Sequence, residues 1–148
     1  MLVHSLAKSA IFFTVGHASQ MHRSQDMSRI RGLFKGNPLV GWGLMFGVMA
    51  IVGMPPFGIF TSEFLILTAT MKDAPYLTPF LLLGLGVAFA ALFRKVQPMV
   101  AGDVPSYQKP MKVAHLPVVL HLVLVLLIGL YMPDFLNAWF HNAVELLK

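Results

Sequence analysis

The sequence has 148 residues, of which 57% are hydrophobic and 11% charged, with no cysteine and a formal net charge of +5. A soluble domain carries about 25% charged residues, and one of this length cannot bury so many apolar side chains. The composition excludes a soluble globule, a disordered chain and a disulfide-stapled protein, as well as Cys-ligated zinc or iron–sulfur centres. We expect one all-α transmembrane domain over residues 1–148.

Four apolar stretches are long enough, or nearly so, to cross a hydrocarbon core of about 30 Å, which takes about 20 helical residues. They cover residues 2–21, 38–71, 77–93 and 116–132. The first has neither a basic n-region nor a small-residue cleavage site, which argues against a secretory signal peptide. Residues 134–147 place apolar side chains on one face, which predicts an amphipathic helix at the membrane interface.

The basic residues are divided unequally between the two sides of the predicted membrane domain. Eight lie in the two long loops, and two lie on the opposite side: Arg23, Arg29, Arg31, Lys35, Arg94, Lys95, Lys109 and Lys112 against Lys72 and Lys148. Because such residues gather on cytoplasmic loops, we expect both loops in the cytoplasm and the C-terminus outside the inner membrane. The basic excess therefore gives no support for nucleic-acid binding. Prolines in Gln97–Pro110 oppose regular structure and predict a connector there.

Lys8 is a charged residue inside the first apolar stretch, about 10 Å along the helix. A charge at membrane depth is costly and by default marks an ion or proton path. His4 lies four residues earlier and therefore shares a helix face with Lys8. Alternatively, the lysine side chain snorkels to the nearer interface. The pattern makes Lys8, with His4 beside it, a candidate proton-relay residue.

The second apolar stretch is interrupted in its middle by Gly53-Met54-Pro55-Pro56-Phe57-Gly58. As one continuous helix, its roughly 34 residues would be about 50 Å long, which exceeds the bilayer. The two prolines remove backbone donors and the flanking glycines add conformational freedom, so the sequence predicts a helix break at Gly53, Pro55, Pro56 and Gly58. Broken helices recur at transport sites. A plain proline kink, or two helices joined by a tight turn, is the alternative.

Glu63 is the only acidic residue inside a predicted span, and it follows Pro56 by seven residues. A carboxylate beside carbonyls that the prolines leave unpaired is a candidate proton-relay station, and a structural ion pair is the alternative. His121, in the fourth stretch, is a weaker candidate, because a hydrogen-bonded packing histidine explains it equally well. The six histidines lack acidic or cysteine companions at ligand spacing, so neither a metal nor a cofactor is predicted. No motif for covalent chemistry is present.

Two motifs resemble those of a known family. The segment His4–Phe13 resembles the H-x-x-x-K-A-x-L-F helix of the antiporter-like, proton-conducting subunits of complex I. The segment Gly53–Phe64 resembles their broken helix, and its PPFG and SEF elements are most similar to component F of the formate hydrogenlyase and hydrogenase-4 type. That type belongs to the group 4 membrane-bound nickel–iron hydrogenases. The resemblance implies that Lys8 is the central-relay lysine, that His4 precedes it by one turn, and that Glu63 is the terminal proton-exchange residue.

The resemblance also implies partners and a function. The partners are the lipid bilayer, other membrane subunits and a peripheral hydrogenase or dehydrogenase module, which carries out the redox chemistry. Alternatives within transport are a subunit of NADH:quinone oxidoreductase, of a cation/proton antiporter or of a bicarbonate-uptake system. An alternative of another class is a non-conducting assembly fragment. Family members have about fourteen helices, whereas this chain resembles the last four, so we expect a gene fragment, a split subunit or a misassigned start.

Overall fold

The computed structural model describes residues 1–103 and 115–131, and every regular element within them is helical. The elements are α1 (Leu2–His22), α2 (Leu33–Gly36), α3 (Pro38–Ile51), α4 (Gly58–Asp73), the 3-10 helix η1 (Pro75–Leu77), α5 (Thr78–Ala101) and α6 (Leu116–Leu130). The all-helical fold predicted from the sequence is confirmed for this part of the chain. The interfacial helix predicted over 134–147 lies outside the described residues.

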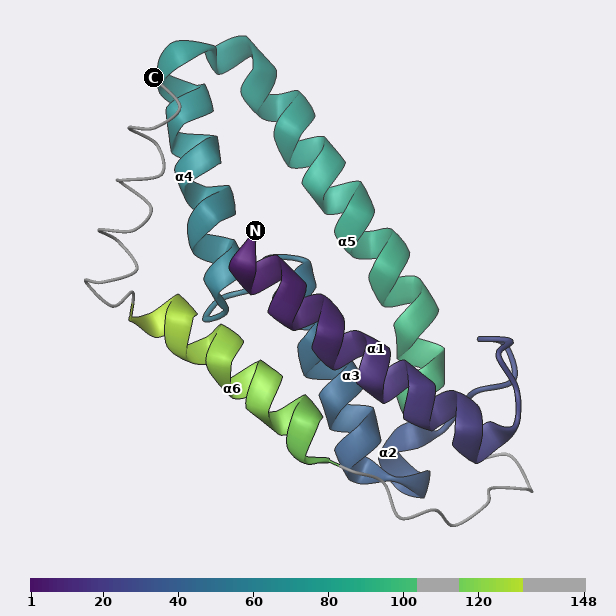
Figure 1. Ribbon diagram of the computed structural model, residues 1–148. Helices are drawn as coiled ribbons and strands as arrows, with labels where there is room; N and C mark the ends of the chain where they lie inside the picture. The colour runs from purple at the N-terminus through teal and green to yellow at the C-terminus, as the bar shows by residue number, and fades with distance from the viewer. Residues whose placement is uncertain (104–114, 132–148) are drawn as a thin grey trace.

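Three helices, α1, α3 and α6, form the body of the molecule, with α1 packed against both of the others (Figure 1). The helices α4 and α5 form an antiparallel hairpin that is joined at η1. The closed end of this hairpin projects beyond the N-terminal end of α1 (Figure 1). The C-terminal part of α5 returns to the body, where it packs against α2 and α3.

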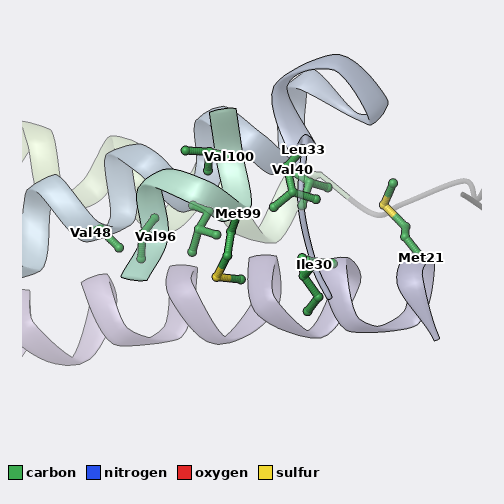
Figure 2. Packing of buried hydrophobic residues seen from close by; sticks show 10 residues of the cluster. Met21, Ile30, Leu33, Val40, Val48, Val96, Met99 and Val100 are labelled. Atoms are coloured by element: carbon green, nitrogen blue, oxygen red, sulfur yellow. The ribbon is translucent and has the colours of Figure 1, made fainter. Parts of the chain in front are cut away.

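The larger hydrophobic core lies where α1, α2, α3 and the end of α5 meet, and we call it the loop-side core. Figure 2 shows eight of its side chains gathered between these elements: Met21, Ile30, Leu33, Val40, Val48, Val96, Met99 and Val100. Ile30, from the loop before α2, is 1% exposed, and Leu33 is fully buried. Because removing a side chain of this size from water contributes about 1.5–3 kcal/mol, the core fixes the loop onto the helices.

The helix α5 is longer than the sequence predicted, since it continues through Pro98 to Ala101. The prediction that Gln97–Pro110 opposes regular structure is therefore wrong up to Ala101, and residues 104–110 lie outside the described part. A proline inside a helix costs about 3 kcal/mol. Three residues close to Pro98 in the sequence belong to the loop-side core: Val96 before it, and Met99 and Val100 after it. Their burial outweighs the cost of the proline.

Among the described residues, one helical segment is long and apolar enough to cross a membrane, and it covers Pro75–Ala101. In the most apolar part of this segment, no residue is buried by the rest of the described chain. The helices α3 and α6 are apolar but shorter. The number of membrane spans therefore stays a prediction.

Candidate functional site

The junction between α3 and α4 begins with a helix-ending motif at Gly53. Its φ of 70° lies in the left-handed region, which glycine adopts readily. The Gly53 N–H donates to the Ala50 carbonyl at 3.4 Å, and the Met54 N–H donates to the Met49 carbonyl at 3.0 Å. This pair of bonds is the Schellman arrangement, which satisfies carbonyls at the end of a helix. The Phe57 N–H then donates to the Met54 carbonyl at 3.1 Å and closes a turn over the two prolines, which a cis peptide bond joins.

Phe57 anchors the junction to the body of the molecule. Its side chain is 7% exposed and belongs to a second, smaller core with Ala7 of α1, Ala50 of α3 and Val125 of α6. Because Phe57 shares this core with residues of three helices, the turn that leads into α4 is held at a defined position. The first turn of α4 follows directly, at Gly58.

The Glu63 carboxylate lies against the α-carbon of Gly53. A Cβ atom added to Gly53 would overlap Oε2 of Glu63 and would lie 2.9 Å from its Oε1. The half-buried Glu63 side chain is therefore placed between the C-terminal end of α3 and the first turns of α4. Those two helix ends carry partial charges of opposite sign. Within residues 1–103 and 115–131, no ion pair involves Glu63.

Lys8 lies on a different face of α1 from the residues that pack in the body. Its side chain is exposed, whereas Ala7, Ala10 and Thr14 are fully buried. In the part of the chain that the structure describes, no hydrogen bond or ion pair joins Lys8 to Glu63. The structure thus leaves Lys8 on an exposed face of α1, without a direct bond to Glu63 among the described residues.

A cavity of about 880 Å³ opens between the start of α1, the start of α4 and the end of α6. His4 lines it from α1, and the hydroxyl residues Thr61 and Ser62 line it from α4. The cavity brings His4 close to the helix that carries Glu63. Sequence reasoning missed Thr61 and Ser62, although both directly precede Glu63 and are polar residues within an apolar stretch.

His121 is engaged in packing between α6 and α1. Its Nδ1 lies 2.6 Å from the carbonyl oxygen of Pro117, one turn earlier in α6. The imidazole ring contacts Phe13 of α1, with ring centroids 5.6 Å apart. These contacts favour the packing interpretation over a relay role. Among the described residues, no three His, Asp or Glu side chains are grouped so as to hold a metal ion.

Comparison with known families identifies the kind of protein to which this junction belongs. Residues 1–90 match the family described as "NADH:quinone oxidoreductase/Mrp antiporter, TM". The chain belongs to this family of transmembrane proteins. The match confirms the predicted membrane location and the predicted resemblance to antiporter-like subunits. It covers α1, α3, α4 and the junction between them.

Several curated relatives agree with this assignment. The hydrogenase-4 component F homolog of Methylacidiphilum infernorum is 41% identical over the whole chain, which covers 31% of that protein. The NADH-ubiquinone oxidoreductase chain 4 of Chondrus crispus is 28% identical, again over the whole chain and 31% of that protein. An Na(+)/H(+) antiporter subunit of Alkalihalophilus pseudofirmus is 25% identical over 57% of the chain and 17% of its own length. The chain therefore spans about a third of the length of the first two relatives.

Proposed function

We propose that the chain is the C-terminal part of a proton-translocating membrane subunit of a hydrogenase-type or complex I-like redox complex. The observation that carries the proposal is the Glu63 carboxylate at the junction between α3 and α4, against Gly53. An ionisable group at membrane depth is expensive and is characteristic of proton relays. The proposed role of Glu63 is to accept a proton from inside the membrane and release it toward the outer face.

The proposal treats α3 and α4 as the two halves of one membrane span that is broken at Gly53–Gly58. With α1, α5 and α6, this gives four spans. Non-helical backbone is tolerated at membrane depth where it is buried in protein or lines water. Phe57, within the break, is buried in protein, and a cavity that can hold water lies beside the first turn of α4. Water in that cavity, between His4 and the hydroxyls of Thr61 and Ser62, would connect α1 with α4.

Lys8 enters the proposal through the uncovered face of α1. A lysine that faced lipid at this depth would be costly, and charges within spans almost always face protein or water. We propose that other helices of the complex cover this face, and that Lys8 delivers protons from them toward α4. The peripheral module would be a hydrogenase or a dehydrogenase, and would supply the driving force through its redox chemistry.

The test is proton translocation in the assembled complex, measured in native membrane vesicles that carry Glu63→Gln or Lys8→Ala. Each has a matched control on the exposed C-terminal end of α4, where Asp73→Asn removes an acid and Lys72→Ala removes a base. We expect both relay variants to lose proton translocation while the complex still assembles. The two controls should translocate protons at the normal rate.

Two other outcomes would overturn the proposal. Full translocation in both relay variants would mean that the chain is a non-conducting assembly element. Retained proton translocation with a loss of sodium transport would instead place the chain with cation/proton antiporters. Partner subunits recovered with the purified complex identify the redox module, and nickel–iron hydrogenase subunits are the expected result.

Orientation is tested separately, because the chain contains no cysteine. Single cysteines introduced as Arg29→Cys and Lys72→Cys can therefore be labelled without background. Both positions are exposed. We expect a membrane-impermeant thiol reagent to label Lys72→Cys from outside and Arg29→Cys only from the cytoplasmic side. The reverse pattern would contradict the proposed topology.

A further inference from the structure

The last turn of α6 contacts the junction between α3 and α4. Its central residue is Gly129, which sequence reasoning did not single out. A Cβ atom added to Gly129 would overlap the carbonyl oxygen of Pro56, and would lie 2.5 Å from the nitrogen of Gly58 and 2.7 Å from the carbonyl carbon of Phe57. Three consecutive backbone units of the junction therefore lie directly against one α-carbon. No residue with a side chain fits at position 129 in this arrangement.

The contact is reciprocal between Gly129 and Gly58. A Cβ atom added to Gly58 would lie 3.2 Å from the nitrogen of Gly129 and 3.4 Å from its α-carbon. The backbones of α4 and α6 thus touch at the point where α4 begins. Four residues away, Val125 of α6 is fully buried and belongs to the same small core as Phe57. The end of α6 consequently fixes both the backbone and the aromatic anchor of the junction.

From this geometry we infer that Gly129 is a positioning residue for Glu63, an inference that rests on the proposed function. The start of α4 is set by its contact with Gly129, and Glu63 follows Gly58 by five residues of rigid helix. On the other side of the junction, the Glu63 carboxylate lies against Gly53 with no room for a Cβ. A side chain at position 129 must push residues 56–58 away from α6. The carboxylate would then shift relative to the end of α3.

The experiment uses Gly129→Ala in the assembled complex, with Gly84→Ala in α5 as the matched control. Gly84 is also a glycine within a helix, but a Cβ atom there would meet nothing within 4 Å. We expect Gly129→Ala to reduce proton translocation about tenfold, since a displacement near 1 Å from a reactive geometry has effects of this order or larger. The pH dependence of translocation should also shift, because Glu63 would sit in a changed environment. The control should change neither the rate nor the pH dependence.

A second variant keeps the inference testable if Gly129→Ala does not assemble. Gly58→Ala introduces the milder contact from the other side of the same crossing, and should give a smaller loss with a pH shift in the same direction. A third measurement separates positioning from general damage. The amount of assembled complex recovered with Gly129→Ala should equal the amount recovered with Gly84→Ala, which would show that the loss of translocation is not a loss of assembly.

The possible results distinguish a failure of the proposed function from a failure of the inference about Gly129. If Glu63→Gln and Lys8→Ala both leave translocation intact, the proposed function fails. If Glu63→Gln abolishes translocation while Gly129→Ala and Gly58→Ala behave like Gly84→Ala, the inference about Gly129 fails alone. A loss of translocation in Gly129→Ala with an unshifted pH dependence would also overturn the inference, since it would indicate a structural role unrelated to Glu63.

Discussion

The two ends of the helical body are built in different ways. At the loop end, α1, α2, α3 and α5 enclose the loop-side core, in which Ile30, Leu33 and Met99 are at most 1% exposed. At the other end, the contacts around Gly58 and Gly129 are made mainly by backbone, and a cavity of about 880 Å³ opens beside them. The ionisable Glu63 lies at this second end. The larger side-chain core therefore lies at the end of the molecule that does not contain Glu63.

This difference has a physical reason. Side-chain packing holds an element firmly but leaves no space for water, because protein interiors are close-packed. Backbone contact through glycines brings helix ends together without filling the space beside them. A carboxylate and water can then occupy the junction. The comparison predicts that substitutions at the loop end change stability, whereas substitutions at the junction change both stability and function.

The largest effect is expected from Leu33→Ala in the loop-side core. Leu33 is fully buried, and truncation of such a leucine costs about 2–5 kcal/mol. The matched control is Leu83→Ala on α5, where the side chain is 66% exposed and the change should stay within about 0.5 kcal/mol. Denaturation of the purified protein in detergent measures both free energies of unfolding. Equal losses for the two variants would mean that the loop-side core does not hold this end.

An effect of similar size is expected from Gly53→Ala at the junction. Alanine at a left-handed φ costs about 1–2 kcal/mol, and displacement of the Glu63 carboxylate adds about 1–3 kcal/mol. The second part should disappear in a Glu63→Ala background, where the obstructing carboxylate is absent. A double-mutant cycle on the free energy of unfolding separates the two parts. Strict additivity would show that Gly53 and Glu63 do not interact.

The sequence predicted the helical fold and the residues at the junction, because the relevant signals are local. The run Gly53-Met54-Pro55-Pro56 ends a helix through glycine freedom and missing donors, whatever surrounds it. The length of α5 was not predictable in the same way. Pro98 argues locally for an end, and it is overruled by core packing between Val96, Met99 and residues of distant segments.

The site was predicted in part. Glu63 was identified because an acidic residue in an apolar stretch is conspicuous in any sequence. Its position against Gly53, and the contact of Gly129 with residues 56–58, depend on how α4 and α6 cross, which no local pattern encodes. The role of Gly129 was hidden for the further reason that glycine is frequent in membrane helices.

Helix packing in the body provides a third prediction, which tests whether glycines outside the junction act only on stability. A Cβ atom at Gly43 of α3 would lie 2.8 Å from Cγ2 of the buried Thr14 and 2.9 Å from Cγ1 of Val118. Gly43→Ala should therefore destabilise the protein by about 1–3 kcal/mol through overpacking. Gly16→Ala in α1 meets nothing within 4 Å, and should be neutral or stabilising by up to about 1 kcal/mol. Thermal denaturation in detergent compares them, and destabilisation of both to the same extent would refute the packing explanation.

The smallest effect concerns the loop itself, where Asp26 organises the turn before α2. Asp26 Oδ1 accepts hydrogen bonds from the Ser28 hydroxyl at 2.8 Å and from the Ser28 N–H at 2.9 Å. These bonds hold the pKa of Asp26 below its usual value. The hydrogen bond from the Ser28 hydroxyl lowers the pKa more than the bond from the Ser28 N–H does. A lowered pKa means that folding favours the carboxylate. Its stabilising contribution is present above the unfolded pKa of about 3.9 and is lost as the pH falls through the lower folded pKa.

Ser28→Ala removes the hydroxyl donor and keeps the N–H donor, so the pKa of Asp26 should rise part of the way to its usual value. Titration of the Asp26 carboxyl carbon by NMR in detergent micelles measures the change. Ser5→Ala is the control, because the Ser5 hydroxyl donates to the Met1 carbonyl, away from this loop. Proton translocation should be unchanged in Ser28→Ala, since the loop lies at the end of the molecule that does not contain Glu63. A loss of translocation in Ser28→Ala would contradict the division between the two ends, because the loop would then take part in function as well as in packing.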